Sequence, residues 1–190
     1  MMRIITGSAK GKHLLSLDGE ATRPTSERIK GAMFSSIQFD LEDRIVLDLF
    51  AGTGQLGLEA LSRGARSAMF VDASRDAVEL VKKNAKACGF FEKSRYLVSD
   101  YRNYLRKAGG REKFDLVFID PPYAMECAGD AVMRLVDEDM LLPGALIVIE
   151  CGDEKLELEG ENFSGFELLK NTSYGKKTTV VILLYRGNGE

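Results

Sequence analysis

Histidine is nearly absent from this sequence: the 190 residues include one, His13, in a stretch rich in glycine and lysine. A histidine general base, a histidine-containing nucleophilic triad and a histidine metal site would each depend on this single side chain. The composition therefore argues against all three kinds of site.

Cysteine is also scarce. The three residues Cys88, Cys127 and Cys151 lie far apart and form no CxxC pair. This spacing is typical neither of a disulfide framework nor of a zinc site. We expect all three to be small buried side chains, and we expect the protein to hold no metal ion.

Long apolar runs are missing too. No run approaches the roughly 18 residues that a membrane-spanning helix needs, and the first residues, MMRIITGSAKGKH, lack the apolar segment of a secretory signal. We therefore expect a cytoplasmic protein with no membrane partner. With 45% hydrophobic and 29% charged residues, the chain is typical of a single globular domain over residues 1–190.

The charge is small in total but unevenly distributed. A net charge of −3 and a pI of about 5.4 argue weakly against a nucleic-acid partner. The first 17 residues nevertheless contain three cations and no acid, whereas residues 137–167 contain ten acids and one lysine. We interpret the acidic stretch as solvated surface. The basic end is compatible with solvated surface or with a contact to a polyanion, and its cations are Arg3, Lys10 and Lys12.

Short apolar runs rich in β-branched residues alternate with helix-like segments from residue 44 onward. Such runs are typical of parallel strands covered on both faces, and the expected strands are 45–50, 68–72, 95–100, 114–120 and 145–151. Two further runs within 166–186 are joined by a polar connection that contains glycine, which predicts an antiparallel pair. The pattern predicts an α/β fold with a doubly wound, mostly parallel, seven-stranded sheet that ends in an antiparallel strand pair.

Two helices can be placed from their ends. Ser74 and Gly89 are the residue types expected at the start and just past the end of a helix. Ahead of the first strand, Thr25 or Ser26 can cap a helix whose apolar face recurs every fourth residue, at Ile29, Met33 and Ile37. Residues 1–40 are therefore expected to form a basic arm followed by a helix.

A glycine-rich turn follows the first predicted strand. Gly52, Gly54 and Gly57 spell GxGxxG between a strand and a helix, and Asp72 ends the next strand 20 residues after Gly52. An acid at this spacing can hold the hydroxyl groups of a ribose. The pattern predicts a cofactor that contains adenosine, and both nicotinamide dinucleotides and S-adenosylmethionine satisfy it.

Asp48 distinguishes these two cofactors. It lies within the first strand, four residues before Gly52, where a loop that binds pyrophosphate has no use for a further negative charge. Near the ammonium or sulfonium of S-adenosylmethionine a carboxylate is favourable. The alternative is that Asp48 only accepts hydrogen bonds from amides of the loop.

Two more residues are expected at the same edge of the sheet. Asp100 ends the third predicted strand, Tyr101 follows it, and ligands of open α/β sheets bind at the carboxyl ends of the strands. Asp100 can equally serve as the N-cap of the helix that follows.

The fourth predicted strand ends in the sequence FIDPPY. Pro121 and Pro122 fix two consecutive φ angles and remove two amide donors, so the polar groups that remain around Asp120 are acceptors. Acceptors suit an amino group, and the ring of Tyr123 offers a planar base a stacking surface worth about 1 to 3 kcal/mol. This corner is expected to hold the exocyclic amine of a nucleobase.

Methyl transfer to such an amine needs little acid–base chemistry. The amine is a weak nucleophile because its lone pair is delocalised into the ring, and acceptors on its protons would aim the lone pair at the methyl group. Positioning is then the main contribution to the rate. After transfer the nitrogen is strongly acidic, so no histidine base is required.

Four motifs in order resemble the RsmD family, the bacterial 16S rRNA guanine-N2 methyltransferases. The motifs are RIITGSAKGKHL (3–14), TRPTSERIKGAMF (22–34), DLFAGTGQLGLEALSRGA (48–65) and DPPY (120–123), and the resemblance covers nearly the whole chain. It implies a Rossmann-like class I methyltransferase fold. It also implies an S-adenosylmethionine-dependent enzyme that methylates the 2-amino group of one guanine in small-subunit ribosomal RNA.

The resemblance also implies roles for individual residues. Asp120 to Tyr123 would hold the base, and Arg23, Pro24 and Thr25 would belong to a segment that closes over the pocket. The cofactor site would be lined by Phe50, Ala51, Gly52, Thr53, Gly54, Asp72 and Asp100, in addition to Asp48 and Tyr101.

The basic residues acquire a role from the same resemblance. Arg3, Lys10, Lys12 and Arg23 would contact RNA phosphates, and Lys176 and Lys177 could extend that surface. The expected partner is 16S rRNA or the assembled small ribosomal subunit, and the expected state is a monomer. The alternatives are methylation of another amine such as that of adenine, a nicotinamide-dependent oxidoreductase, and a non-catalytic RNA-binding protein.

Overall fold

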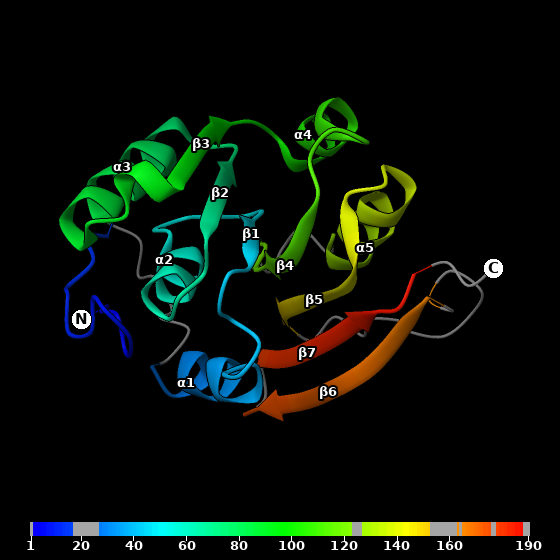
Figure 1. Cartoon of the computed structure of the whole chain (residues 1–190), viewed down its shortest axis with the longest axis horizontal. Helices are drawn as coiled ribbons and strands as arrows, with labels where there is room; N and C mark the ends of the chain where they lie inside the picture. Colours follow the sequence, from blue (N-terminus) through cyan, green and yellow to red (C-terminus); the bar gives the residue numbers. More distant parts are fainter. Residues whose placement is uncertain are drawn as a thin grey trace. The chain divides into compact units, whose positions relative to one another are not determined.

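The computed structural model describes residues 2–16, 27–122, 127–152, 163, 165–175 and 178–187. Within them, seven strands make the predicted mixed, mostly parallel sheet with an antiparallel pair at its carboxyl-terminal end (Figure 1). The chain divides into two compact units, Met1–Asp100 and Tyr101–Glu190, which are described in turn. The assignment of a single domain stays a prediction.

The first unit contains three parallel strands. They are β1 (Ile45–Asp48), β2 (Ser67–Asp72) and β3 (Ser94–Val98), and β2 pairs with both of the others. Most of β1 and β2 is buried, as their near-continuous apolar sequences predict. Because the strands run in one direction, Asp48 and Asp72 both come to the carboxyl edge of this sheet.

The helices of the first unit are α1 (Glu27–Ser36), α2 (Gln55–Ser62) and α3 (Arg75–Cys88), followed by a 3₁₀ turn at Phe91–Lys93. The predicted ends of α3 are confirmed. The Ser74 hydroxyl accepts a hydrogen bond from the Ala77 amide, and Gly89 takes a left-handed conformation with φ 80°.

The predicted apolar face of α1 is confirmed in part. Met33 and Ile37 are buried and Ile29 is half-buried. Its expected caps, Thr25 and Ser26, lie outside the described residues. The side chain of Lys30 is also fully buried, which the pattern did not predict.

Residues 2–15 form a compact turn, which we call the N-terminal hairpin. The Ile4 amide donates to the Lys12 carbonyl, the Leu14 amide donates to the Met2 carbonyl, and Arg3 and His13 form an antiparallel bridge. Ile4, Ala9 and Leu14 are buried, whereas the cations Lys10 and Lys12 are exposed. The predicted basic arm is thus a folded element.

The described part of the second unit contains four strands in the order β4, β5, β7, β6. They are β4 (Phe114–Ile119), β5 (Leu141–Cys151), β6 (Phe166–Tyr174) and β7 (Thr178–Tyr185). The β4–β5 pairing is parallel, and β7 runs antiparallel to both β5 and β6, as predicted for the end of the chain. The helices of this unit are α4 (Tyr101–Ala108) and α5 (Ala128–Asp137).

Two further predictions concern the described residues. Cys88, Cys127 and Cys151 are buried, as expected. None of the helices in the described part of the chain is long and apolar enough to cross a membrane.

Candidate active site

The first strand ends in a buried carboxylate. Asp48 is 2% exposed, and its Oδ2 accepts a hydrogen bond of 2.9 Å from the Gly57 amide in the first turn of α2. A Cβ atom at Gly57 would lie 2.4 Å from the Phe70 ring and 3.2 Å from Asp48 Oδ2. Glycine at this position therefore allows α2 to pack closely on the strands, the role expected of the third glycine in the motif.

The other two glycines shape the turn itself. Gly52 and Gly54 have positive φ angles of 53° and 78°, a region that favours glycine. A Cβ atom at Gly54 would lie 2.9 Å from Val81 of α3, whereas one at Gly52 would have no atom of the described residues within 4 Å. The loop therefore packs against the protein at Gly54 and leaves open space at Gly52, where a ligand can approach the backbone.

Asp72 supports this loop through both of its carboxylate oxygens. Its Oδ2 accepts a hydrogen bond of 2.8 Å from the Gly52 amide, and its Oδ1 accepts one of 2.8 Å from the Ser74 amide. A carboxylate offers about four lone-pair directions. Both oxygens can therefore accept a further hydrogen bond from a ribose hydroxyl while they hold the loop.

Burial sets the protonation of Asp48. Loss of hydration raises its pKa from the ordinary 3.8 to about 7; the Gly57 hydrogen bond opposes this rise and the nearby charge of Asp72 adds to it. The interaction with Gly57 matches the alternative in which Asp48 accepts from loop amides. A cationic ligand beside Asp48 would favour the ionised form of the carboxylate.

The remaining loop residues contact β2 and the N-terminal hairpin. The Ala51 amide donates to the Val71 carbonyl at 3.0 Å, which ties the loop to the end of β2. Thr53 is buried, and its hydroxyl donates to Met2 Sδ of the hairpin at 3.1 Å. Phe50 is half-buried.

Asp100 and Tyr101 differ in their surroundings. Asp100 is exposed and follows β3, where the Ser99 amide donates to the Asp72 carbonyl at 2.9 Å. Tyr101 is buried at the start of α4, and its hydroxyl donates to Asp130 Oδ2 of α5 at 2.7 Å. Burial and the hydrogen bond to Asp130 raise the pKa of Tyr101, so its hydroxyl stays protonated. This bond joins α4 to α5.

The acceptor-only corner lies directly after β4. Asp120 is half-buried, Pro121 is buried and Pro122 is exposed, and the four strand residues before them, 116–119, are buried. Tyr123 lies outside the described residues. A site for a base at Asp120 to Tyr123 stays a prediction.

The predicted RNA contacts are described in part. Arg3, on the hairpin, is exposed and forms an ion pair with Glu27 at 3.0 Å. Arg23, Lys176 and Lys177 lie outside the described residues, as do Pro24 and Thr25. Among the described residues, no three side chains of histidine, cysteine, aspartate or glutamate are grouped as metal ligands would be.

Residues 2–183 match the model of a protein family described as "Conserved hypothetical protein 95". The chain is 33% identical over 176 residues to ribosomal RNA small subunit methyltransferase D of Haemophilus influenzae, covering 92% of this chain and 89% of the relative. The chain belongs to this RsmD family. It is also 36% identical to YlbH of Bacillus subtilis over 187 residues, covering 98% of this chain and all of the relative.

The RsmD resemblance extends to solved structures. The structure of the putative methyltransferase yhhF from Escherichia coli superposes on this chain with a TM-score of 0.87 at 28% sequence identity. The superposition covers 98% of this chain and 99% of the yhhF chain. The predicted Rossmann-like methyltransferase fold is confirmed.

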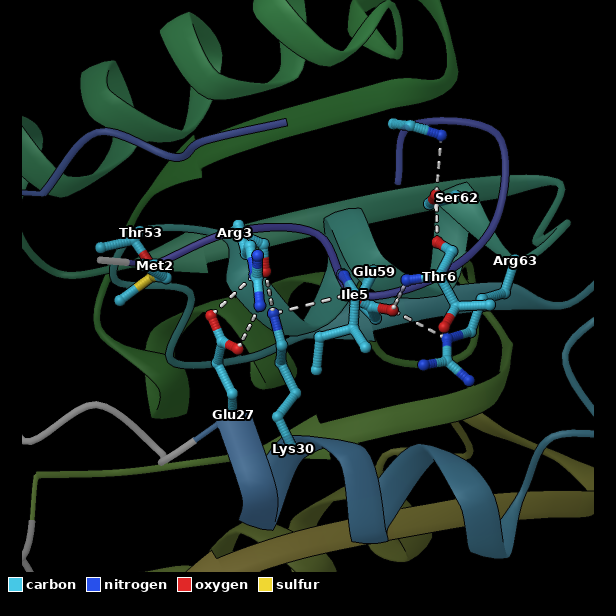
Figure 2. A network of polar contacts seen from close by, with 12 residues as sticks. Met2, Arg3, Ile5, Thr6, Glu27, Lys30, Thr53, Glu59, Ser62 and Arg63 are labelled. Atoms are coloured by element: carbon cyan, nitrogen blue, oxygen red, sulfur yellow. Dashed lines mark hydrogen bonds and ion pairs between the residues drawn. The ribbon is translucent and has the colours of Figure 1, made fainter. Parts of the chain in front are cut away.

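One cluster in this RsmD-family chain was not predicted from the sequence. Figure 2 shows Glu59 of α2 between the hairpin, α1 and Arg63. Its carboxylate accepts hydrogen bonds from the Ile5 and Thr6 amides at 2.7 and 3.0 Å and from Arg63 Nε at 2.9 Å. It also pairs with Lys30 Nζ at 3.4 Å, and Lys30 donates to the Arg3 carbonyl at 2.7 Å. Burial lowers the pKa of Lys30, and the charge of Glu59 opposes this shift.

Ser62, one turn further along α2, extends the same contact. Its hydroxyl donates to the Thr6 carbonyl at 2.6 Å and accepts from the Ala9 amide at 3.0 Å. At Gly7, where φ is 89°, a Cβ atom would lie 1.8 Å from the Ser62 carbonyl oxygen. The signal in the sequence was a single charged residue among the uncharged residues of QLGLEALS. In the structure, every residue of this helix except Gln55 is buried, so the charge of Glu59 requires partners inside the protein.

Proposed function

We propose that this RsmD-family protein is an S-adenosylmethionine-dependent methyltransferase that acts on the exocyclic 2-amino group of a guanine in 16S rRNA. The observation that carries this proposal is the family match over residues 2–183 together with a glycine loop whose Gly52 amide is held by Asp72. That loop is the part of the fold that binds adenosine-containing cofactors.

S-adenosylmethionine supplies the methyl group as a cationic sulfonium. In this proposal Asp72 accepts hydrogen bonds from the ribose hydroxyls, and Asp48 supplies a carboxylate whose charge is complementary to the cationic end of the cofactor. Because the pKa of Asp48 is about 7 without a ligand, a nearby cation would stabilise the ionised form. Phe50, Thr53, Asp100 and Tyr101 complete the proposed cofactor site.

The proposed role of Asp120 and the prolines is to hold and orient the guanine amine. Asp120 and a proline carbonyl accept from the two protons of the amine, and Tyr123 stacks on the base. With the amine oriented in this way, its lone pair would form the new bond to the methyl carbon while the carbon–sulfur bond breaks and its electrons stay on sulfur. The methylated nitrogen then releases a proton to Asp120 or to water, so no histidine base takes part.

RNA binding is assigned to the basic residues Arg3, Lys10, Lys12 and Arg23. Phosphate contacts of this kind position a nucleic acid without reading its sequence. The target guanine must be unpaired or extruded to reach the site. We propose 16S rRNA or the assembled small ribosomal subunit as partner, a monomer as the acting form and the cytoplasm as its location.

Asp48 is the observation that favours this function over a nicotinamide-dependent reaction. A buried acid beneath the loop would oppose the negative charge of a pyrophosphate, and it suits a cationic methyl donor. Methylation of an adenine amine is the second candidate, because the acceptor-only corner suits either base.

The test is methylation of small subunits isolated from cells that lack this protein. Purified protein and S-adenosylmethionine should restore N2-methylguanine, measured by mass spectrometry of digested 16S rRNA. Asp120→Asn should lower the rate about 100-fold or more, because the negative charge that strengthens the hydrogen bond to the amine is lost and the amide NH₂ can misposition the base. Its affinity for the cofactor, measured by calorimetry, should stay unchanged.

Asp137→Asn, an exposed change in the same unit, is the matched control and should keep full activity. Unchanged N2-methylguanine in the rRNA of the deletion strain would refute guanine as the target. Methylated adenine in place of guanine would support the second candidate.

A further inference from the structure

Asn84 of α3 is a fully buried side chain that joins two parts of the proposed site. Its Oδ1 accepts a hydrogen bond of 2.8 Å from the Leu15 amide, and its Nδ2 donates to the Leu15 carbonyl at 3.1 Å. The same Nδ2 donates to the Thr53 carbonyl at 2.9 Å. One side chain therefore holds the end of the N-terminal hairpin and the middle of the glycine loop.

The other end of the hairpin reaches the same residue of the loop. The Thr53 hydroxyl donates to Met2 Sδ at 3.1 Å, and Figure 2 shows this contact beside the Glu59 cluster. Both ends of the hairpin therefore meet at Thr53, directly through Met2 and indirectly through Asn84. Thr53 lies between Gly52 and Gly54, the two positions with positive φ.

The hairpin can transmit a shift of this loop because it is held along its length. Glu59 accepts hydrogen bonds from two of its backbone amides. Ser62 makes one hydrogen bond to Thr6 and one to Ala9. Its exposed side carries Lys10 and Lys12, the cations assigned to RNA phosphates. A ligand that fixes the position of Thr53 would therefore restrict the hairpin through Asn84.

A purely structural role for Asn84 has a different consequence. A buried amide that only satisfies the backbone at Leu15 would lower stability when removed, and it would do so equally with and without cofactor. Two hydrogen bonds suffice for that role. The third bond, to Thr53, connects Leu15 to the cofactor loop.

We propose that Asn84 is a positioning residue that makes RNA affinity depend on whether the glycine loop holds its cofactor. This inference rests on the function proposed above. Coupling of two binding sites is reciprocal, so the cofactor must tighten RNA binding by the same factor by which RNA tightens cofactor binding. Such factors are commonly about 5- to 150-fold.

The experiment measures that factor with S-adenosylhomocysteine, which occupies the site without reacting. The dissociation constant for small subunits from cells lacking the protein is measured with and without saturating S-adenosylhomocysteine, for the wild type and for Asn84→Ala. The wild type should bind subunits at least about fivefold more tightly with the ligand. In Asn84→Ala this ratio should fall close to one, while affinity without the ligand stays within about twofold of the wild type.

Val132→Ala is the control for lost stability. Val132 is fully buried in α5 of the second unit and should lower stability while it leaves the ratio unchanged. A wild-type ratio of one, or an Asn84→Ala ratio equal to that of the wild type, would overturn the inference. Failure of the wild type to bind S-adenosylhomocysteine at all would instead overturn the proposed function.

Amide hydrogen exchange tests the coupling in the wild type, so the result does not depend on whether Asn84→Ala folds. In the wild type, S-adenosylhomocysteine should slow exchange of the Leu15 amide, which donates to Asn84, and of the Leu14 amide within the hairpin. Exchange at Lys113, in the second unit, should not change. Equal exchange at Leu14 and Leu15 with and without the ligand would refute the coupling.

Discussion

Asp48 combines a functional demand with a cost to stability. Burial raises its pKa from 3.8 to about 7, so ionising it in the folded protein is unfavourable. An acid whose pKa is higher in the folded state contributes stability that is fully present below its unfolded pKa. That contribution is lost as the pH rises through the folded value, so the loss falls between about pH 4 and pH 7.

Asp48→Asn is therefore expected to stabilise the protein above pH 7. Asparagine keeps an oxygen acceptor for the Gly57 amide and removes the buried charge. The gain in the free energy of unfolding should grow from pH 4 to pH 7 and then level off, with an upper limit of about 4 kcal/mol. Urea unfolding at pH 5 and pH 8 measures it.

The same substitution should weaken S-adenosylmethionine binding by about tenfold or more, because the complementary charge is lost. Calorimetry at pH 8 provides this second readout. A variant that is no more stable at pH 8 than the wild type would contradict the raised pKa. Unchanged cofactor affinity would remove Asp48 from the proposed site.

Residues with a fixed spacing could be predicted from the sequence. Gly57 and Asp72 lie where the glycine motif requires, because a strand–turn–helix unit determines which backbone groups face each other over short distances. Lys30 and Glu59 could not be paired in the same way. They come from separate helices, and only the tertiary structure brings their side chains within 3.4 Å.

At the scale of elements, the hairpin shows what composition alone leaves out. Its three cations predicted a basic arm and gave no sign of a buried side, yet Ile4, Ala9 and Leu14 are buried. Two of its backbone amides donate hydrogen bonds to Glu59, a residue more than 50 positions away in the sequence. Long-range hydrogen bonds of this kind leave no periodic pattern in the sequence and could not be predicted from it. The strands and α3 could be predicted because their apolar residues recur with a regular spacing.

The Glu59 cluster should decide whether the hairpin stays docked. Glu59→Ala leaves the ammonium of Lys30 buried without its carboxylate and removes the acceptor of two amides. We expect a loss of about 3 to 5 kcal/mol in the free energy of unfolding. Adding Lys30→Met to Glu59→Gln should recover a large part of this loss, because no unpaired charge remains. Urea unfolding of each variant measures both effects.

Arg44→Ala is the control for this series. Its partner Asp40 is exposed and 3.8 Å away, so the loss should be no more than about 1 kcal/mol. Amide exchange at Ile5 and Thr6 should accelerate in Glu59→Ala and stay slow in Arg44→Ala. A Glu59→Ala variant as stable as Arg44→Ala would show that the cluster does not hold the hairpin.

At the scale of the whole molecule, a protein of net charge −3 is proposed to bind a polyanion. The total charge therefore predicts little, and the location of the cations matters more. In the described residues the hairpin presents Lys10 and Lys12 to solvent from an element that its own buried contacts hold in place. Phosphate contacts made from such an element lose less side-chain and backbone freedom than contacts made from a disordered arm.

Replacing Lys10 and Lys12 by alanine should therefore change the salt dependence of RNA binding. Each phosphate contact contributes about 0.7 to 0.9 to the slope of log affinity against log salt, so the double variant should lower the slope by about 1.5. Replacing Lys83 and Lys86, exposed on α3, removes the same charge at another place and should leave the slope nearly unchanged. The affinity of both variants for small subunits is measured by filter binding at a series of salt concentrations, and the slope is taken from these affinities. If the two pairs reduce the slope equally, binding follows the total charge of the molecule, and the hairpin has no special part in it.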